Sequence, residues 1–187
     1  KPVIIAGAGI RQAGVRNEFR ELVQLLKIPV ITTLPAVDLL PEDSLSRLGY
    51  LGGTARREAG IALAAADVVL TLGTRLCGKQ TGYNLEMFAP RAKLLRVDID
   101  QSEFEHRLKK DEVQICASLD SFIKESVTLL HNRQTMEEHS DWLNACGTMK
   151  KILANCDVTF GNKAVYKLTE LLPDYFNITL DVGNNLI

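Results

Sequence analysis

The sequence predicts an α/β protein whose Rossmann-like parallel sheet carries helices on both faces. Apolar segments at 2–6, 67–72 and 93–97 predict buried strands, since parallel strands are covered on both sides. At 12–27 the apolar residues recur every three or four positions, as in an amphipathic helix. The two periods alternate along the chain, which is the order expected when crossover helices join parallel strands.

The elements follow one another from the first residues. We expect strands at 2–6, 28–32, 67–72, 93–97 and 113–117, and helices at 12–27, 58–66, 101–109 and 118–130. Segments 34–53 and 73–90 predict long loops, the second with at most one helical turn; loops of this length often bind ligands. Cys116, inside an apolar strand pattern, is expected to be a small buried thiol.

We expect a Rossmann-like domain at 1–131, a linker and helix at 132–160, and a truncated α/β segment at 161–187 that begins a further domain. The polar stretch 131–139 marks the first boundary, and helices are predicted at 141–153 and 163–172. A last strand from Asn177 runs into Asp181-Val-Gly183 and resembles the first strand of a domain. We therefore expect the chain to be an internal piece of a larger protein.

Composition and charge argue against several classes. Lys and Arg number 22 against 23 Asp and Glu, a net charge of -1, so nothing favours nucleic acid or an anionic membrane. No apolar run approaches the roughly 18 to 20 residues that cross a bilayer. The four cysteines form no Cys-x-x-Cys pair and the three histidines lack ligand spacing. This pattern favours reduced thiols in a cytoplasmic protein over disulfides or a metal site.

A glycine turn follows the first strand. Glycines in Gly7-Ala-Gly-Ile-Arg-Gln-Ala-Gly14 would let the backbone approach a phosphate at the start of a helix. The spacing is nevertheless G-x-G-x4-G rather than G-x-G-x-x-G, and the second strand ends at Thr32-Thr33 without an acidic residue for a ribose. Both a dinucleotide site and a structural turn fit this stretch.

Polar side chains also follow later strands. Asp98 and Asp100 end a strand at the edge where such sheets bind ligands. Their carboxylates can accept ribose hydroxyls, although Asp100 can equally cap the next helix. Arg75 would face a diphosphate or a carboxylate, or lie on a surface loop. The sequence shows no nucleophile–base pair, carboxylate dyad or metal cluster, so we expect no catalytic residues in this chain.

Several segments carry a family resemblance when taken in order. They are 1–10, 28–34, 40–42, 48–52, 66–75, 80–84, 97–100, 171–173 and 181–183. Together they resemble the thiamine-diphosphate (ThDP) enzymes of the acetolactate synthase and pyruvate decarboxylase superfamily, and most of all acetolactate synthase-like proteins. By this resemblance the chain is a central domain followed by the start of a C-terminal diphosphate-binding domain.

The resemblance implies a full-length enzyme of three α/β domains that works as a dimer or tetramer. It would be a ThDP-dependent transferase or lyase that decarboxylates a 2-oxo acid and joins the product to a second carbonyl. ThDP and Mg²⁺ would be bound outside this chain, so the piece alone is expected to be inactive. The alternative is a noncatalytic nucleotide-binding or scaffold domain; an NAD-dependent dehydrogenase is disfavoured by the glycine spacing.

In this superfamily the central domain binds FAD in acetolactate synthases, ADP in a related decarboxylase and nothing in other members. Gly53-Thr54-Ala55 stands where acetolactate synthases carry Met-His-Gly beside the flavin, and Ser118 stands where relatives place an aspartate. Both departures weigh against FAD. The residues that match nucleotide-contacting positions are Gly7, Gly9, Arg75, Asp98 and Asp100.

Overall fold

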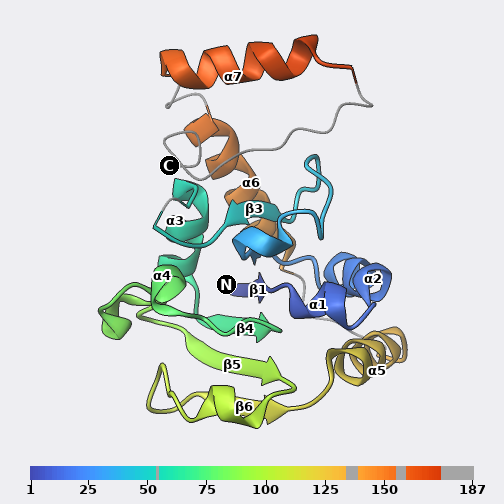
Figure 1. Cartoon of the computed structure of the whole chain (residues 1–187). Coiled ribbons are helices and arrows are strands. Elements are labelled where there is room, and N and C mark those ends of the chain that lie inside the picture. The colour runs from blue at the N-terminus through green and yellow to red at the C-terminus, as the bar shows by residue number, and fades with distance from the viewer. Residues whose placement is uncertain (54, 134–138, 155–158, 174–187) are drawn as a thin grey trace.

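A six-stranded parallel sheet organises the part of the chain that the structure describes (Figure 1). The computed structural model describes residues 1–53, 55–133, 139–154 and 159–173. The strand order is β3-β2-β1-β4-β5-β6, so the chain reverses its direction of travel across the sheet between β1 and β4, as in Rossmann-like folds. The strands are β1 (Pro2–Ala6), β2 (Val30–Thr32), β3 (Arg47–Tyr50), β4 (Val68–Leu72), β5 (Lys93–Asp98) and β6 (Val113–Cys116). The predicted fold class is confirmed.

Helices cover both faces of this sheet. One face carries α2 packed against α5, and the other carries α3 packed against α6. Short 3-10 turns follow β2, α4 and β5. The helices are α1 (Gly9–Gln12), α2 (Arg16–Leu26), α3 (Arg57–Ala65), α4 (Gly78–Thr81), α5 (Leu119–His131), α6 (Ser140–Ala154) and α7 (Phe160–Leu171), and the turns are η1 (Leu34–Ala36), η2 (Leu85–Met87) and η3 (Gln101–Phe104).

The central strand β1 supplies both hydrophobic cores. Its side chains alternate between the two faces, so Val3 and Ile5 join the core under α3 and α6. Ile4 and Ala6 join the core under α2 and α5. All four are at most 1% exposed, which explains why this strand is apolar throughout instead of alternating with polar residues.

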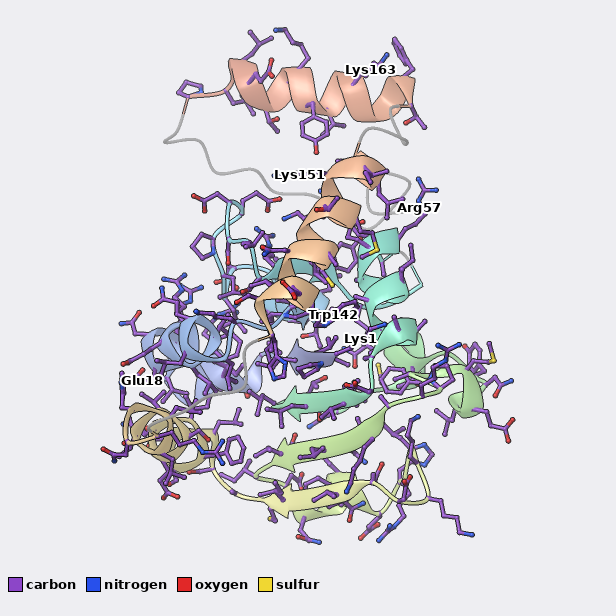
Figure 2. All side chains as sticks on the ribbon, turned by 180° about the vertical axis from the view of Figure 1, so that it is seen from behind. Lys1, Glu18, Arg57, Trp142, Lys151 and Lys163 are labelled. Carbon is purple, nitrogen blue, oxygen red and sulfur yellow. The ribbon has the colours of Figure 1, made fainter. Side chains whose placement is uncertain are left out.

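Helix α6 belongs physically with the sheet. The indole Nε1 of Trp142 donates a hydrogen bond to the carbonyl oxygen of Pro2 at 3.0 Å, and Lys150 Nζ donates to the carbonyl of Arg47 at 2.9 Å. Figure 2 shows Trp142 beside Lys1, whose ammonium lies 5.7 Å from the centre of the indole ring. The helix predicted to follow the first domain boundary is thus attached to β1 and β3, while the proposed division at 131 stays a prediction.

Two predicted elements are wrong. Segment 34–53, expected to be a loop, contains the edge strand β3, which is only four residues long and includes Gly49 at a φ of 97°. The helix expected at 101–109 is limited to η3, because the Arg96 guanidinium takes the carbonyl oxygens of Glu103 and His106. Those oxygens would otherwise accept the hydrogen bonds of a longer helix.

The predictions for Cys116 and for the last third of the chain have different outcomes. Cys116 is exposed, not buried, because β6 is the edge strand of the described sheet. The helices predicted at 141–153 and 163–172 correspond to α6 and α7. The strand expected after Asn177 lies outside the described residues.

Candidate functional site

A cavity of about 470 Å³ opens at the carboxyl ends of β1, β4 and β5. In Figure 1 the arrowheads of β4 and β5 point toward this edge, on the side of α1 and α5. The position is next to the reversal of strand order between β1 and β4, where open parallel sheets bind ligands. The volume lies within the range of about 300–1,000 Å³ that is usual for small-molecule sites.

Four of the five predicted site residues line this cavity. Gly9 comes from the turn after β1, Arg75 follows β4, and Asp98 and Asp100 come from the end of β5. They are brought together because parallel strands end at the same edge of the sheet. Each residue was predicted separately from its position after a strand, and the shared edge of the sheet explains why they lie close together.

Gly7 lies outside the lining and has a packing role. Its N–H donates to the carbonyl of Leu72 at 2.8 Å, and a Cβ added to it would meet the carbonyl oxygen of Gly73 at 2.0 Å. A Cβ on Gly9 would lie 2.9 Å from the Gly73 Cα. Any side chain here would push the turn after β1 away from the turn after β4, so glycines bring the two backbones into contact at the floor of the cavity.

Asp98 and Asp100 form a short chain of hydrogen bonds after β5. Asp98 Oδ1 accepts from the backbone N–H of Asp100 at 3.1 Å. Asp100 Oδ1 accepts from the hydroxyl of Ser102 at 2.7 Å and from its backbone N–H at 2.9 Å. Asp100 therefore caps η3, one of its two roles foreseen from the sequence. The hydroxyl of Ser102, followed by its N–H, lowers the pKa of Asp100, so this carboxylate is ionised near neutral pH.

Arg75 forms an ion pair with Glu103, a second lining residue of the cavity. Its Nε lies 2.9 Å from Oε1 of Glu103, and its side chain is 79% exposed, whereas that of Glu103 is 22% exposed. Arg75 is the single basic side chain among the lining residues, which also include four carboxylates, those of Asp98, Asp100, Glu103 and Asp120. Asp120 is paired with Lys124 at 2.6 Å. The lining thus carries more acidic than basic side chains, and the guanidinium of Arg75 is already paired with Glu103.

A buried ion pair holds the segment that carries Glu103. Arg96, in the middle of β5, donates from Nη1 to Oε1 of Glu112 at 3.0 Å and from Nη2 to the carbonyl of Glu103 at 2.8 Å. Glu112 Oε2 accepts from the N–H groups of Leu108 and Lys109 at 3.0 and 3.2 Å. Burial raises the pKa of Glu112, but hydrogen bonds from Gln114, Leu108 and Lys109 and the charge of Arg96 outweigh it, so the pKa is lowered.

Sequence reasoning missed both Glu103 and this ion pair. One signal was present: an arginine inside the apolar strand Lys93–Asp98 implies a buried charge that needs a partner. Within the described ranges, no three His, Cys, Asp or Glu side chains gather to hold a metal ion. None of the described helices is long and apolar enough to cross a bilayer.

Residues 1–126 match the family model described as thiamine pyrophosphate enzyme, central domain. The chain is 30% identical over 197 residues to a "Probable acetolactate synthase large subunit" of Methanocaldococcus jannaschii, a match that covers 99% of this chain and 33% of the relative. It is 31% identical over 197 residues to acetolactate synthase 1, chloroplastic, of Oryza sativa subsp. japonica, covering 99% and 29%. An acetolactate synthase of Mycobacterium bovis is 35% identical over 144 residues, covering 76% and 23%. The chain spans about a third of the length of the first two relatives.

Proposed function

Because the chain belongs to the family of the thiamine pyrophosphate enzyme central domain, we propose that it is part of an acetolactate synthase-like enzyme that acts on 2-oxo acids. Support comes from the match over residues 1–126 and from relatives whose names give acetolactate synthase. ThDP, held with Mg²⁺ by parts of the protein outside this chain, supplies the electron sink for decarboxylation and carboligation. This chain would contribute no catalytic group and would be inactive alone.

We propose that the central domain has a structural role and also binds a nucleotide in the cavity at the carboxyl edge. The observation that carries this proposal is the meeting of Gly9, Arg75, Asp98 and Asp100, from three strand ends, on one cavity. Asp98 and Asp100 each use one carboxylate oxygen within the loop and offer the other to ribose hydroxyls. Arg75 is the group able to reach a phosphate.

We propose ADP as the preferred ligand, ahead of FAD. Carboxylates at the end of β5 suit a ribose, which ADP and FAD share. The residues that accompany the flavin in acetolactate synthases are replaced here by Gly53-Thr54-Ala55, of which Thr54 lies outside the described residues. Asp98 and Asp100, which would accept the ribose hydroxyls, are both present in the cavity lining.

We also propose that the parent protein self-associates to a dimer or tetramer and works in the cytoplasm. The name "large subunit" carried by a relative supports assembly into a larger complex. Among the described cysteines, Cys77, Cys116 and Cys146 are free thiols, which suits a reducing compartment.

Calorimetric titration of the purified chain with ADP and with FAD tests the nucleotide site. We expect Asp98→Asn to weaken ADP binding roughly tenfold, since a hydrogen bond to a charged acceptor is worth about 1.5–3 kcal/mol. Asp111→Asn, the same change at an exposed residue outside the cavity, is the matched control and should leave the affinity unchanged. Equal affinities of the two variants, or an absence of ADP and FAD binding, would contradict the site.

The enzymatic proposal has a separate test. The full-length protein, supplied with ThDP, Mg²⁺ and pyruvate, should release carbon dioxide, and residues 1–187 alone should release none. A full-length protein that stays inactive on several 2-oxo acids while binding ADP would favour the noncatalytic nucleotide-binding alternative.

A further inference from the structure

The Arg75–Glu103 ion pair decides what the cavity can offer to a ligand. Glu103 Oε1 holds the guanidinium Nε of Arg75 at 2.9 Å, and no other basic side chain belongs to the lining of the described cavity. A phosphate group recognised here by Arg75 must therefore compete with a carboxylate that is already in place.

The two partners of this pair are held very differently. The backbone of Glu103 is fixed, because its carbonyl accepts at 2.8 Å from Arg96, which is itself bound to the buried Glu112. Arg75 has no such support: its side chain is 79% exposed. Glu103 therefore has a fixed backbone and a mostly covered side chain, and the more exposed Arg75 is the partner able to turn toward a ligand.

A nucleoside and a diphosphate meet different conditions in this cavity. Ribose hydroxyls donate hydrogen bonds, which the carboxylates of Asp98 and Asp100 can accept. A diphosphate brings further negative charge toward the four carboxylates of the lining. It also has to draw Arg75 away, which leaves the charge of Glu103 uncompensated at the wall.

We propose that Glu103 determines the ligand preference of this cavity, by holding Arg75 so that the nucleoside of a nucleotide is accepted more readily than its diphosphate. Unpaired charge placed against one class of ligand is a common source of specificity. This inference rests on the nucleotide-binding function proposed above and names the residue that limits the contribution of the phosphates.

Titration of wild-type and Glu103→Gln protein with adenosine, ADP and inorganic pyrophosphate tests the proposal. Glutamine keeps the shape of the side chain and the backbone carbonyl bound by Arg96, so the wall is retained. We expect affinity for ADP and pyrophosphate to rise by roughly three- to tenfold, as a partly exposed charge is removed a few ångströms away. Adenosine affinity should change less than twofold.

Glu105→Gln is the matched control, because Glu105 is an exposed carboxylate two positions further along the same segment and outside the cavity lining. It removes the same charge and should alter ADP affinity less than twofold. Gains of equal size in both variants would show a general effect of net charge and overturn the proposal.

The Arg75→Met background separates release of Arg75 from simple repulsion. In that background Glu103→Gln should yield a clearly smaller gain in ADP affinity, because no guanidinium remains to be released. An equal gain would overturn the proposal, as would an unchanged ADP affinity in Glu103→Gln or an equal rise for adenosine.

The outcomes also separate the two levels of inference. If neither adenosine nor ADP binds wild-type or Glu103→Gln protein, the nucleotide-binding function fails and this proposal fails with it. If ADP binds both proteins with the same affinity, the nucleotide site stands and the role of Glu103 is rejected.

Discussion

Two arginine–glutamate pairs attach the segment that follows β5, which carries Glu103 and Glu112, and they differ mainly in their contact with water. The side chains of Arg96 and Glu112 are 3% and 0% exposed, whereas those of Arg75 and Glu103 are 79% and 22% exposed. Their shortest N–O distances are nearly equal, at 3.0 and 2.9 Å. Distance alone therefore does not tell a structural pair from an exchangeable one.

Burial decides the difference. A buried pair that loses one partner leaves a charge without solvent, whereas an exposed pair that separates regains water on both sides. Both side chains also bind the backbone of the segment between β5 and β6. Arg96 donates to the carbonyls of Glu103 and His106, and Glu112 accepts from the N–H groups of Leu108 and Lys109. The buried pair thus shapes the wall of the cavity, and the exposed pair remains available to a ligand.

Glu112→Gln should have the largest effect. It leaves the Arg96 guanidinium buried without a counter-charge, and arginine cannot lose its proton to relieve this. We expect the free energy of unfolding, measured with urea, to fall by about 3–5 kcal/mol. Glu105→Gln, at an exposed position, should change it by less than about 0.5 kcal/mol. Coincident urea midpoints would mean that the buried pair has no structural importance.

Arg96→Met should be less damaging, and its cost should depend on pH. In wild-type protein the pKa of Glu112 is held below its ordinary value of 4.5, so its contribution to stability is present above that pH and is lost as the pH falls through the lowered value. In Arg96→Met the stranded carboxylate can take up a proton instead. The difference in unfolding free energy between the two proteins should therefore shrink from pH 7 to pH 3. A difference that is constant over this range would contradict the electrostatic account.

Arg75→Met should have the smallest effect on stability. Exposed ion pairs contribute about 0–1 kcal/mol, so we expect the urea midpoint to stay close to that of the wild type. The ligand titrations should respond instead, with weaker binding of ADP and unchanged binding of adenosine. A large loss of stability would show that this pair, too, is structural.

The sequence predicted the part of the site that follows from strand ends. Asp98 is the last residue of β5 and Arg75 lies three residues after the end of β4, and parallel strands end at one edge, so local patterns were enough. The partner of Arg75 was not predictable in this way, since Glu103 lies on a segment that looked like a continuous helix. In the structure Arg96, on the preceding strand β5, takes the carbonyl oxygens of Glu103 and His106, which a longer helix would need for its own hydrogen bonds.

Similar reasons apply to the remainder of the fold. The edge strand β3 is short and includes a glycine, so neither apolar period is visible in it. The packing role of Gly7 depends on Gly73, which meets it through pairing of β1 with β4. Contacts between distant parts of the chain decide these features, and a single sequence carries no local record of them.

The position of β1 at the middle of the sheet also has a consequence for biosynthesis. Ala6 pairs with Leu72, and the carbonyl of Pro2 is covered by Trp142, so β1, the first strand of this sheet to be synthesised, waits for partners made much later. At roughly 5–20 residues per second, about 3–13 s separate the synthesis of β1 from that of β4. During that interval one edge of a wholly apolar strand stays open, and a chaperone that shields the nascent chain should raise the yield of native protein.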